Sequence, residues 1–136
     1  MTNFYKYIII ILLSFCLSES GKFGVVPTIS VTWDNNIGLN SGIGLALGKW
    51  GEGAFIGIYT SYSFSKKGNN ISFGHYAGVG IATFRLGITR LQLHGSDKKY
   101  WGIETSPSMF IGHLRLGILK NDNKPELSYA LGLGLF

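Results

Sequence analysis

The chain has almost none of the residues that build metal or redox sites. It contains one cysteine, Cys16, and three scattered histidines, His75, His94 and His113. No paired carboxylates accompany the histidines at the spacing of metal ligands. The Gly-x-Gly pairs of the sequence lie inside expected strands, without the strand-to-helix setting of a nucleotide-binding loop. The sequence therefore predicts no metal and no cofactor.

Charge is also scarce. Asp, Glu, Lys and Arg make up 14% of the 136 residues, whereas about 25% is usual in a soluble domain. The mean hydropathy is nevertheless positive, at +0.23, although no long apolar run follows residue 20 and no segment has a clear 3.6-residue apolar period. A membrane β-barrel has this combination of properties, because apolar and polar residues alternate along each of its strands and no long apolar run results.

The N-terminal residues predict export. Lys6 precedes a short apolar run over residues 7–17, and small residues follow at Ser18 and Ser20. This pattern is typical of a secretory signal peptide, here residues 1–20, cut after Ser20. An uncleaved anchor is the alternative; a lipoprotein signal fits less well, because the bulky Phe15 precedes Cys16. Cleavage would remove Cys16 and with it any disulfide, zinc–thiolate site or cysteine nucleophile, and would leave residues 21–136 as a single domain.

Turn residues divide the rest of the chain into eight expected strands. In each of two long stretches, 71–93 and 100–120, the large apolar residues change from the odd to the even positions, or the reverse. This change indicates a tight turn in each stretch, near Ala82–Thr83 and at Ser106–Ser108. The polar segment Lys66–Asn70 is expected to be a loop. The expected strands are 23–33, 37–49, 54–65, two within 71–93, two within 100–120, and 126–136. We predict an all-β fold, an antiparallel up-and-down eight-stranded closed barrel of the transmembrane type.

The last strand carries the clearest alternation. Residues Leu127, Tyr129, Leu131, Leu133 and Leu135 share one face, and small residues occupy the other. The strand resembles the last strand of bacterial outer-membrane β-barrels, which commonly ends in Phe, as this chain does at Phe136. The whole pattern of residues 21–136 resembles small outer-membrane barrels of the general OmpA/OmpX type. The outward loops are very short for that class, and Phe136 is one step out of phase with the Leu/Tyr face.

The resemblance implies a porin-like shape, a Gram-negative outer membrane, a monomer, and recognition by the barrel-assembly machinery through Phe136. Charges in the turns support an orientation. With both chain ends in the periplasm, the second, fourth and sixth turns are short and nearly uncharged. The four outward connections hold the charges Asp34, Lys66, Lys67, Asp97, Lys98, Lys99, Asp122 and Lys124.

Phasing of the strands places several charges on the inner face. The expected lumen cluster consists of Arg85, Glu104, His113 and Arg115, with Glu104 as the main interior acid. Unpaired charges in a narrow lumen are costly, so these groups should pair. They are interpreted as a salt-bridged plug, or alternatively as a polar site or narrow conduit.

The remaining candidate site is an outer rim of lysines, Lys66, Lys67, Lys98, Lys99 and Lys124, which could bind lipopolysaccharide phosphates. The net charge of +5 suits an anionic partner, and export argues against nucleic acid. The expected function is therefore a structural or interaction barrel of the outer membrane. Two alternatives are a soluble periplasmic or secreted barrel that binds a lipid-like ligand, and an outer-membrane lipid-modifying enzyme. No catalytic residue is predicted, since no His-x-Ser motif or nucleophile elbow occurs.

Overall fold

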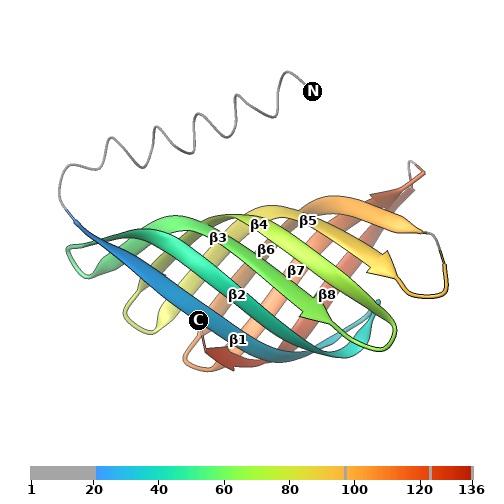
Figure 1. Ribbon diagram of the computed structural model, residues 1–136, viewed down its shortest axis with the longest axis horizontal. Coiled ribbons are helices and arrows are strands. Elements are labelled where there is room, and N and C mark those ends of the chain that lie inside the picture. The colour runs from blue at the N-terminus through green and yellow to red at the C-terminus, as the bar shows by residue number, and fades with distance from the viewer. Residues whose placement is uncertain (1–20, 97, 123, 136) are drawn as a thin grey trace, which may run out of the picture.

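The computed structural model describes residues 21–96, 98–122 and 124–135, and these form a closed antiparallel barrel in which each strand pairs with its neighbours in sequence and β1 also pairs with β8 (Figure 1). The described residues contain no helix long and apolar enough to cross a membrane. The prediction of an all-β, eight-stranded antiparallel closed barrel is confirmed. The predicted signal peptide, residues 1–20, and Phe136 lie outside the described residues. The strands are β1 (Lys22–Asp34), β2 (Gly38–Gly51), β3 (Ala54–Phe64), β4 (Gly68–Val79), β5 (Ala82–Leu93), β6 (Lys99–Met109), β7 (Gly112–Asn121) and β8 (Lys124–Leu135).

The strands are strongly staggered around the barrel. Following paired residues from Lys22 through β2 to β8 leads back to β1 at Thr32, ten positions from the start (32 − 22 = 10). Stagger and strand tilt are linked in a closed barrel, and eight strands leave an interior just wide enough for side chains to fill. The interior should therefore be packed with side chains.

The turn that was predicted at Ser106–Ser108 is wrong. β6 continues through these residues to Met109, and the turn is formed by Phe110 and Ile111. Proline has no N–H to donate to a neighbouring strand. Pro107 is tolerated because the pairing between β6 and β7 is interrupted at this position. Phe110 adopts a left-handed conformation, with φ of 55°. Glycine usually marks such a position, so the sequence carried no signal for this turn.

Two further turn predictions need smaller corrections. The turn expected near Ala82–Thr83 lies at Gly80–Ile81, where Gly80 has φ of 58°. The loop expected over 66–70 is shorter, because β4 begins at Gly68. Asn70 consequently belongs to the strand, and its buried side chain accepts a hydrogen bond from the Thr89 hydroxyl.

The seam between β1 and β8 is short. Only Ile29–Asp34 of β1 pair with β8, so Lys22–Thr28 of β1 and the first residues of β8 have no strand partner across the seam. Asn35 extends the pairing: its N–H donates to the Tyr129 carbonyl (3.0 Å), and its side chain accepts from the Tyr129 N–H (2.8 Å). Backbone N–H groups on a strand point in the same direction at every second residue. At positions 27 and 125 an N–H would therefore point toward these unpaired edges, as those of Asn35 and Tyr129 point toward the seam. Pro27 and Pro125 stand at these positions, where the absence of an N–H costs no hydrogen bond between strands.

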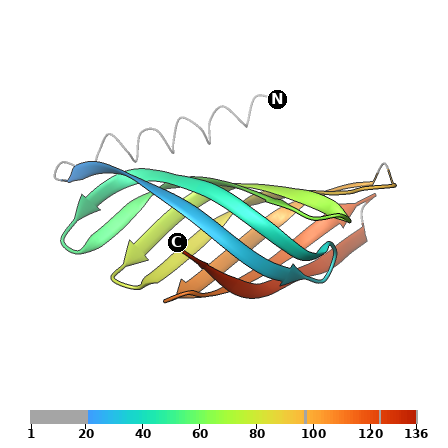
Figure 2. The same cartoon turned by 60° about the horizontal axis from the view of Figure 1, so that its bottom comes forward.

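The two faces of the barrel wall differ sharply in chemistry. Most large apolar side chains point outward, and the inner face carries serine, threonine and charged side chains between two apolar clusters. One cluster, Ile37 with Leu91, Tyr100 and Leu119, closes the end at the β1–β2 turn. The other, Ala46 with Phe55, Tyr59 and Tyr76, closes the end where β1 begins. Figure 2 shows the hairpins β2–β3, β4–β5 and β6–β7 at this second end.

Candidate functional site inside the barrel

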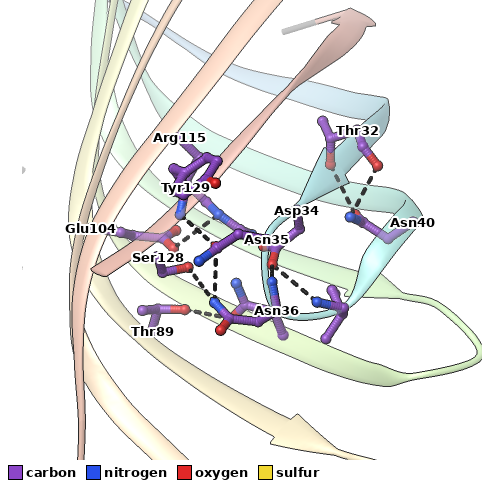
Figure 3. Close-up of polar contacts among 12 residues, drawn as sticks. Thr32, Asp34, Asn35, Asn36, Asn40, Thr89, Glu104, Arg115, Ser128 and Tyr129 are labelled. Carbon is purple, nitrogen blue, oxygen red and sulfur yellow. Dashed lines mark hydrogen bonds and ion pairs between the residues drawn. The ribbon is translucent and has the colours of Figure 1, made fainter. Parts of the chain in front are cut away.

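A buried ion pair lies at the centre of the polar interior. Nη2 of Arg115 on β7 bonds Oδ2 of Asp34 at the end of β1, and the Arg115 Nε lies 3.8 Å from Oε2 of Glu104 on β6 (Figure 3). All three side chains are almost completely buried. One arginine thus connects two carboxylates that come from opposite sides of the seam.

Asp34 was predicted among the outward charges, and this prediction is wrong. Its side chain is 0% exposed and points into the barrel. Oδ1 accepts hydrogen bonds from the N–H groups of Asn36 (2.6 Å) and Ile37 (3.2 Å), which forms an Asx turn. The same carboxylate therefore holds the β1–β2 turn and neutralises Arg115, and Glu104 shares the role of interior acid with it.

The turn that Asp34 holds also closes this end of the lumen. Ile37 is buried against Leu91, Tyr100 and Leu119. The Asn36 side chain donates to the Ser128 hydroxyl across the seam (3.2 Å), as Figure 3 shows. A turn that the sequence indicated only as a polar connection is thus a plug at this end of the barrel.

The other members of the predicted lumen cluster are also inside. Arg85 on β5 lies with its guanidinium carbon 5.2 Å from the centre of the Tyr59 ring. Its Nη2 lies 3.4 Å from the His113 Nε2, and the Tyr59 hydroxyl donates to Oε1 of Glu104 (3.4 Å). Tyr59 therefore bridges two groups, Arg85 with His113 and Glu104 with Arg115. Sequence phasing placed all four charged residues on the inner face, but it missed Tyr59 and Asp34.

A serine–histidine contact is present in this cluster. The Ser108 Oγ lies 2.8 Å from the His113 Nδ1, and both residues are buried. The Arg85 Nη2 lies 3.4 Å from Nε2 and 3.5 Å from Nδ1 of His113, so this contact does not determine which ring nitrogen carries the proton. The other histidines, His75 on β4 and His94 after β5, are exposed.

The interior has very little free space. Its cavity has a volume of about 20 Å³ and is lined by Ser30, Thr32, Ser61 and Ser63 together with the charged cluster. Such a volume holds about one water molecule, whereas ligand pockets are usually several hundred Å³. The polar side chains and the two apolar clusters fill the barrel. Their arrangement suits a plug that fixes the strands better than it suits a conduit or a ligand pocket.

The predicted rim lysines lie together at one end of the barrel. All five are exposed: Lys66, Lys67, Lys98, Lys99 and Lys124. They belong to the connections β3–β4, β5–β6 and β7–β8 or to the first residues of the following strands. The backbone ties two of these connections together, since the His94 N–H donates to the Lys67 carbonyl (2.8 Å). The described part of the chain holds no group of three His, Cys, Asp or Glu residues suited to a metal ion.

No protein-family model, curated protein or solved structure matches this chain.

Replacing Ser108 by alanine tests whether the Ser–His contact is structural. We expect Ser108→Ala to lower the free energy of unfolding by about 1 kcal/mol, since one buried hydrogen bond is lost. We also expect the lipid A of cells that produce the variant to have the same mass spectrum as that of cells with the unchanged protein. Ser41→Ala, at an exposed position of β2, is the control. A lipid A modification that depends on Ser108 but not on Ser41 would contradict the structural role.

Proposed function

We propose that this protein is a small outer-membrane β-barrel with a structural or interaction role, whose lysine-rich end contacts the phosphates of lipopolysaccharide. The observation that carries the proposal is the inverted distribution of side chains. Among the described residues, thirty large hydrophobic side chains are exposed, and nine hydrophobic residues are buried. Thirty exposed apolar side chains are far more than a protein surrounded by water can leave uncovered without associating.

The dimensions of the barrel agree with this proposal. The strands have 10 to 14 residues, and a tilted strand needs about 9–11 to cross a bilayer. Closure pairs most backbone groups between strands, as a hydrocarbon environment demands. Aromatic residues flank the apolar band, with Trp33 and Trp101 toward the lysine-rich end and Phe23 and Trp50 toward the other. Membrane barrels carry such aromatic girdles at both interfaces.

The charge distribution supports an orientation. The turns Glu52–Gly53, Gly80–Ile81 and Phe110–Ile111 contain a single charged residue, while the opposite end carries the five rim lysines. Lipopolysaccharide phosphates lie at the outer surface, and a lysine ammonium binds phosphate as a compact charge. We therefore place the lysine-rich end outside and both chain ends in the periplasm. Recognition of Phe136 by the assembly machinery and a monomeric state belong to the same proposal.

The two alternatives have less support. A soluble barrel that carries a lipid-like ligand needs an apolar lumen with free volume, whereas this lumen is polar and nearly full. A lipid-modifying enzyme needs reactive groups that its substrate can reach, whereas the Ser108–His113 pair is buried in the lumen.

Membrane fractionation tests the proposal. In a Gram-negative host we expect the protein in the outer-membrane fraction, with a faster gel mobility before heating than after it. A closed barrel resists unfolding by detergent until it is heated, and the compact form migrates faster. Extraction with carbonate or urea should leave the folded protein in the membrane. Recovery of the folded chain in the detergent-free soluble fraction would contradict the membrane location and would favour the soluble barrel.

A further inference from the structure

Two cations on the outer wall flank an aromatic side chain. In the paired strands, Trp101 on β6 lies directly opposite Arg90 on β5 and directly opposite Lys120 on β7. Opposed residues on one face of a sheet have Cβ atoms about 4.5–5.5 Å apart. The Arg90 guanidinium carbon lies 5.9 Å from the centre of the indole ring, and Trp101 is 56% exposed. The three side chains therefore form one continuous outward patch.

The cations of this patch have no acidic partner in the part of the chain that the structure describes. The ion pairs that Arg115 makes with Asp34 and Glu104 do not involve them. The Nε of Arg90 is buried and has no hydrogen-bond acceptor. This atom is closed off from solvent, so an anion would be bound by the terminal nitrogens of Arg90 and by Lys120.

An apolar groove begins one step farther along the same strands. Ile88, Ile103 and Ile118 follow Arg90, Trp101 and Lys120 on the outer face, and they pair with one another and with Leu127. The groove has a volume of about 290 Å³, and most of its lining is apolar: Leu86, Ile103, Leu116, Ile118 and Leu127, with Glu104, Thr105 and Gly117. The wall thus presents positive charge at one end of an apolar trough.

We infer that this patch and groove form a binding site for one lipid A moiety of lipopolysaccharide. A phosphate of its headgroup would lie between Arg90 and Lys120, and one acyl chain would follow the groove toward Leu86. The guanidinium offers two parallel donors to phosphate oxygens, and Trp101 suits the boundary between polar and apolar environments. The inference rests on the proposed orientation, which places this end of the barrel in the outer leaflet, where lipid A is the phosphorylated lipid.

Two other outer grooves make useful comparisons. One lies at the seam between Ile29 and Leu133 and has a volume of about 370 Å³. The other lies between Leu45 and Tyr62 and has about 350 Å³. Both are apolar and somewhat larger, but neither continues into an Arg–Trp–Lys row. Volume and apolarity are therefore shared by all three grooves, and charge distinguishes the β5–β7 groove.

Binding of purified lipid A tests the site. The full chain, folded in an uncharged maltoside detergent, would be titrated with bis-phosphorylated lipid A, and bound lipid would be counted by native mass spectrometry. We expect one lipid per chain and a loss of affinity of at least about tenfold in Arg90→Gln/Lys120→Gln, because charge-assisted hydrogen bonds are lost. The matched control, Lys66→Gln/Lys67→Gln, removes the same charge from the rim and should change the affinity less than the wall variant does. Heat-dependent gel mobility establishes that every variant is folded.

Any of the following results would overturn the inference. Equal loss in the wall and rim variants would show that only net charge matters. Equal affinity for dephosphorylated lipid A would show that no phosphate is recognised, and equal affinity for phosphatidylglycerol would show that any anionic lipid is accepted. A protein that inserts in the outer membrane but binds lipid A normally after Arg90→Gln/Lys120→Gln would refute this site and leave the proposed function intact.

Discussion

Asp34→Ala is expected to lower the free energy of unfolding by about 3–5 kcal/mol, which is the usual cost of removing one partner from a buried ion pair. Arg115 would keep its charge at a fully buried position, with only Glu104 at 3.8 Å to balance it. The β1–β2 turn would also lose the acceptor for the N–H groups of Asn36 and Ile37. Urea-induced unfolding in detergent micelles, followed by tryptophan fluorescence, measures the change.

Three further variants separate the causes of this effect. Asp34→Asn keeps an oxygen for the turn but removes the charge, so it isolates the ion pair from the turn. The double variant Asp34→Ala/Arg115→Leu removes both charges and should be more stable than Asp34→Ala, because no unpaired guanidinium remains. Glu126→Ala, at an exposed position of β8, is the control. The role given to Asp34 would be refuted if Asp34→Ala unfolded at the same urea concentration as Glu126→Ala.

Ile43→Arg is expected to destabilise the protein in lipid vesicles by about 2–4 kcal/mol, because an arginine would replace an apolar side chain within the outer band. Ile43 is 58% exposed on β2, between Ile29 of β1 and Tyr62 of β3. In a protein surrounded by water, the same change at an exposed position alters stability by about 0.5 kcal/mol or less. The measurement therefore distinguishes between a lipid and a water environment.

Leu39→Arg provides the matched control. Leu39 is on the same face of the same strand, four residues closer to the lysine-rich end, and is 71% exposed. An arginine near the membrane interface costs about 0–1 kcal/mol. We expect Leu39→Arg to fold into vesicles almost as well as the unchanged protein. Equal tolerance of both arginines, with the folded chains remaining in solution, would refute the membrane environment of the band.

The lumen and the outer wall have different tasks in this interpretation. The interior holds Arg115 against two carboxylates and Arg85 against Tyr59 and His113. It is closed at both ends by side chains, which leaves a cavity of about 20 Å³. The grooves on the outside are more than ten times larger. Binding to this barrel is therefore expected on its outer wall and its lysine-rich rim.

The positions of most strands could be predicted from the sequence, and the misplaced turn shows why others could not. Ser106, Pro107 and Ser108 are turn-forming residues, yet they continue β6, with Ser106 and Ser108 filling narrow inner positions. Phe110 and Ile111 are strand-forming residues, yet they make the turn. Closure overrides local preference here, because the pairing of β6 with β5 extends to Met109 opposite Ala82.

Alternation by itself determined which side chains point inward, because the direction of a side chain in a strand depends only on its parity. That was sufficient to place Arg85, Glu104, His113 and Arg115 inside, and Leu131 and Leu133 outside. It did not determine which of them meet. Asp34 and Arg115 are 81 positions apart in the chain, and they are joined only because the sheet closes with a stagger of ten positions from Lys22 to Thr32. The stagger arises from every strand pairing together, so only the tertiary structure decided the ion pair, the plug and the Arg90–Trp101–Lys120 row.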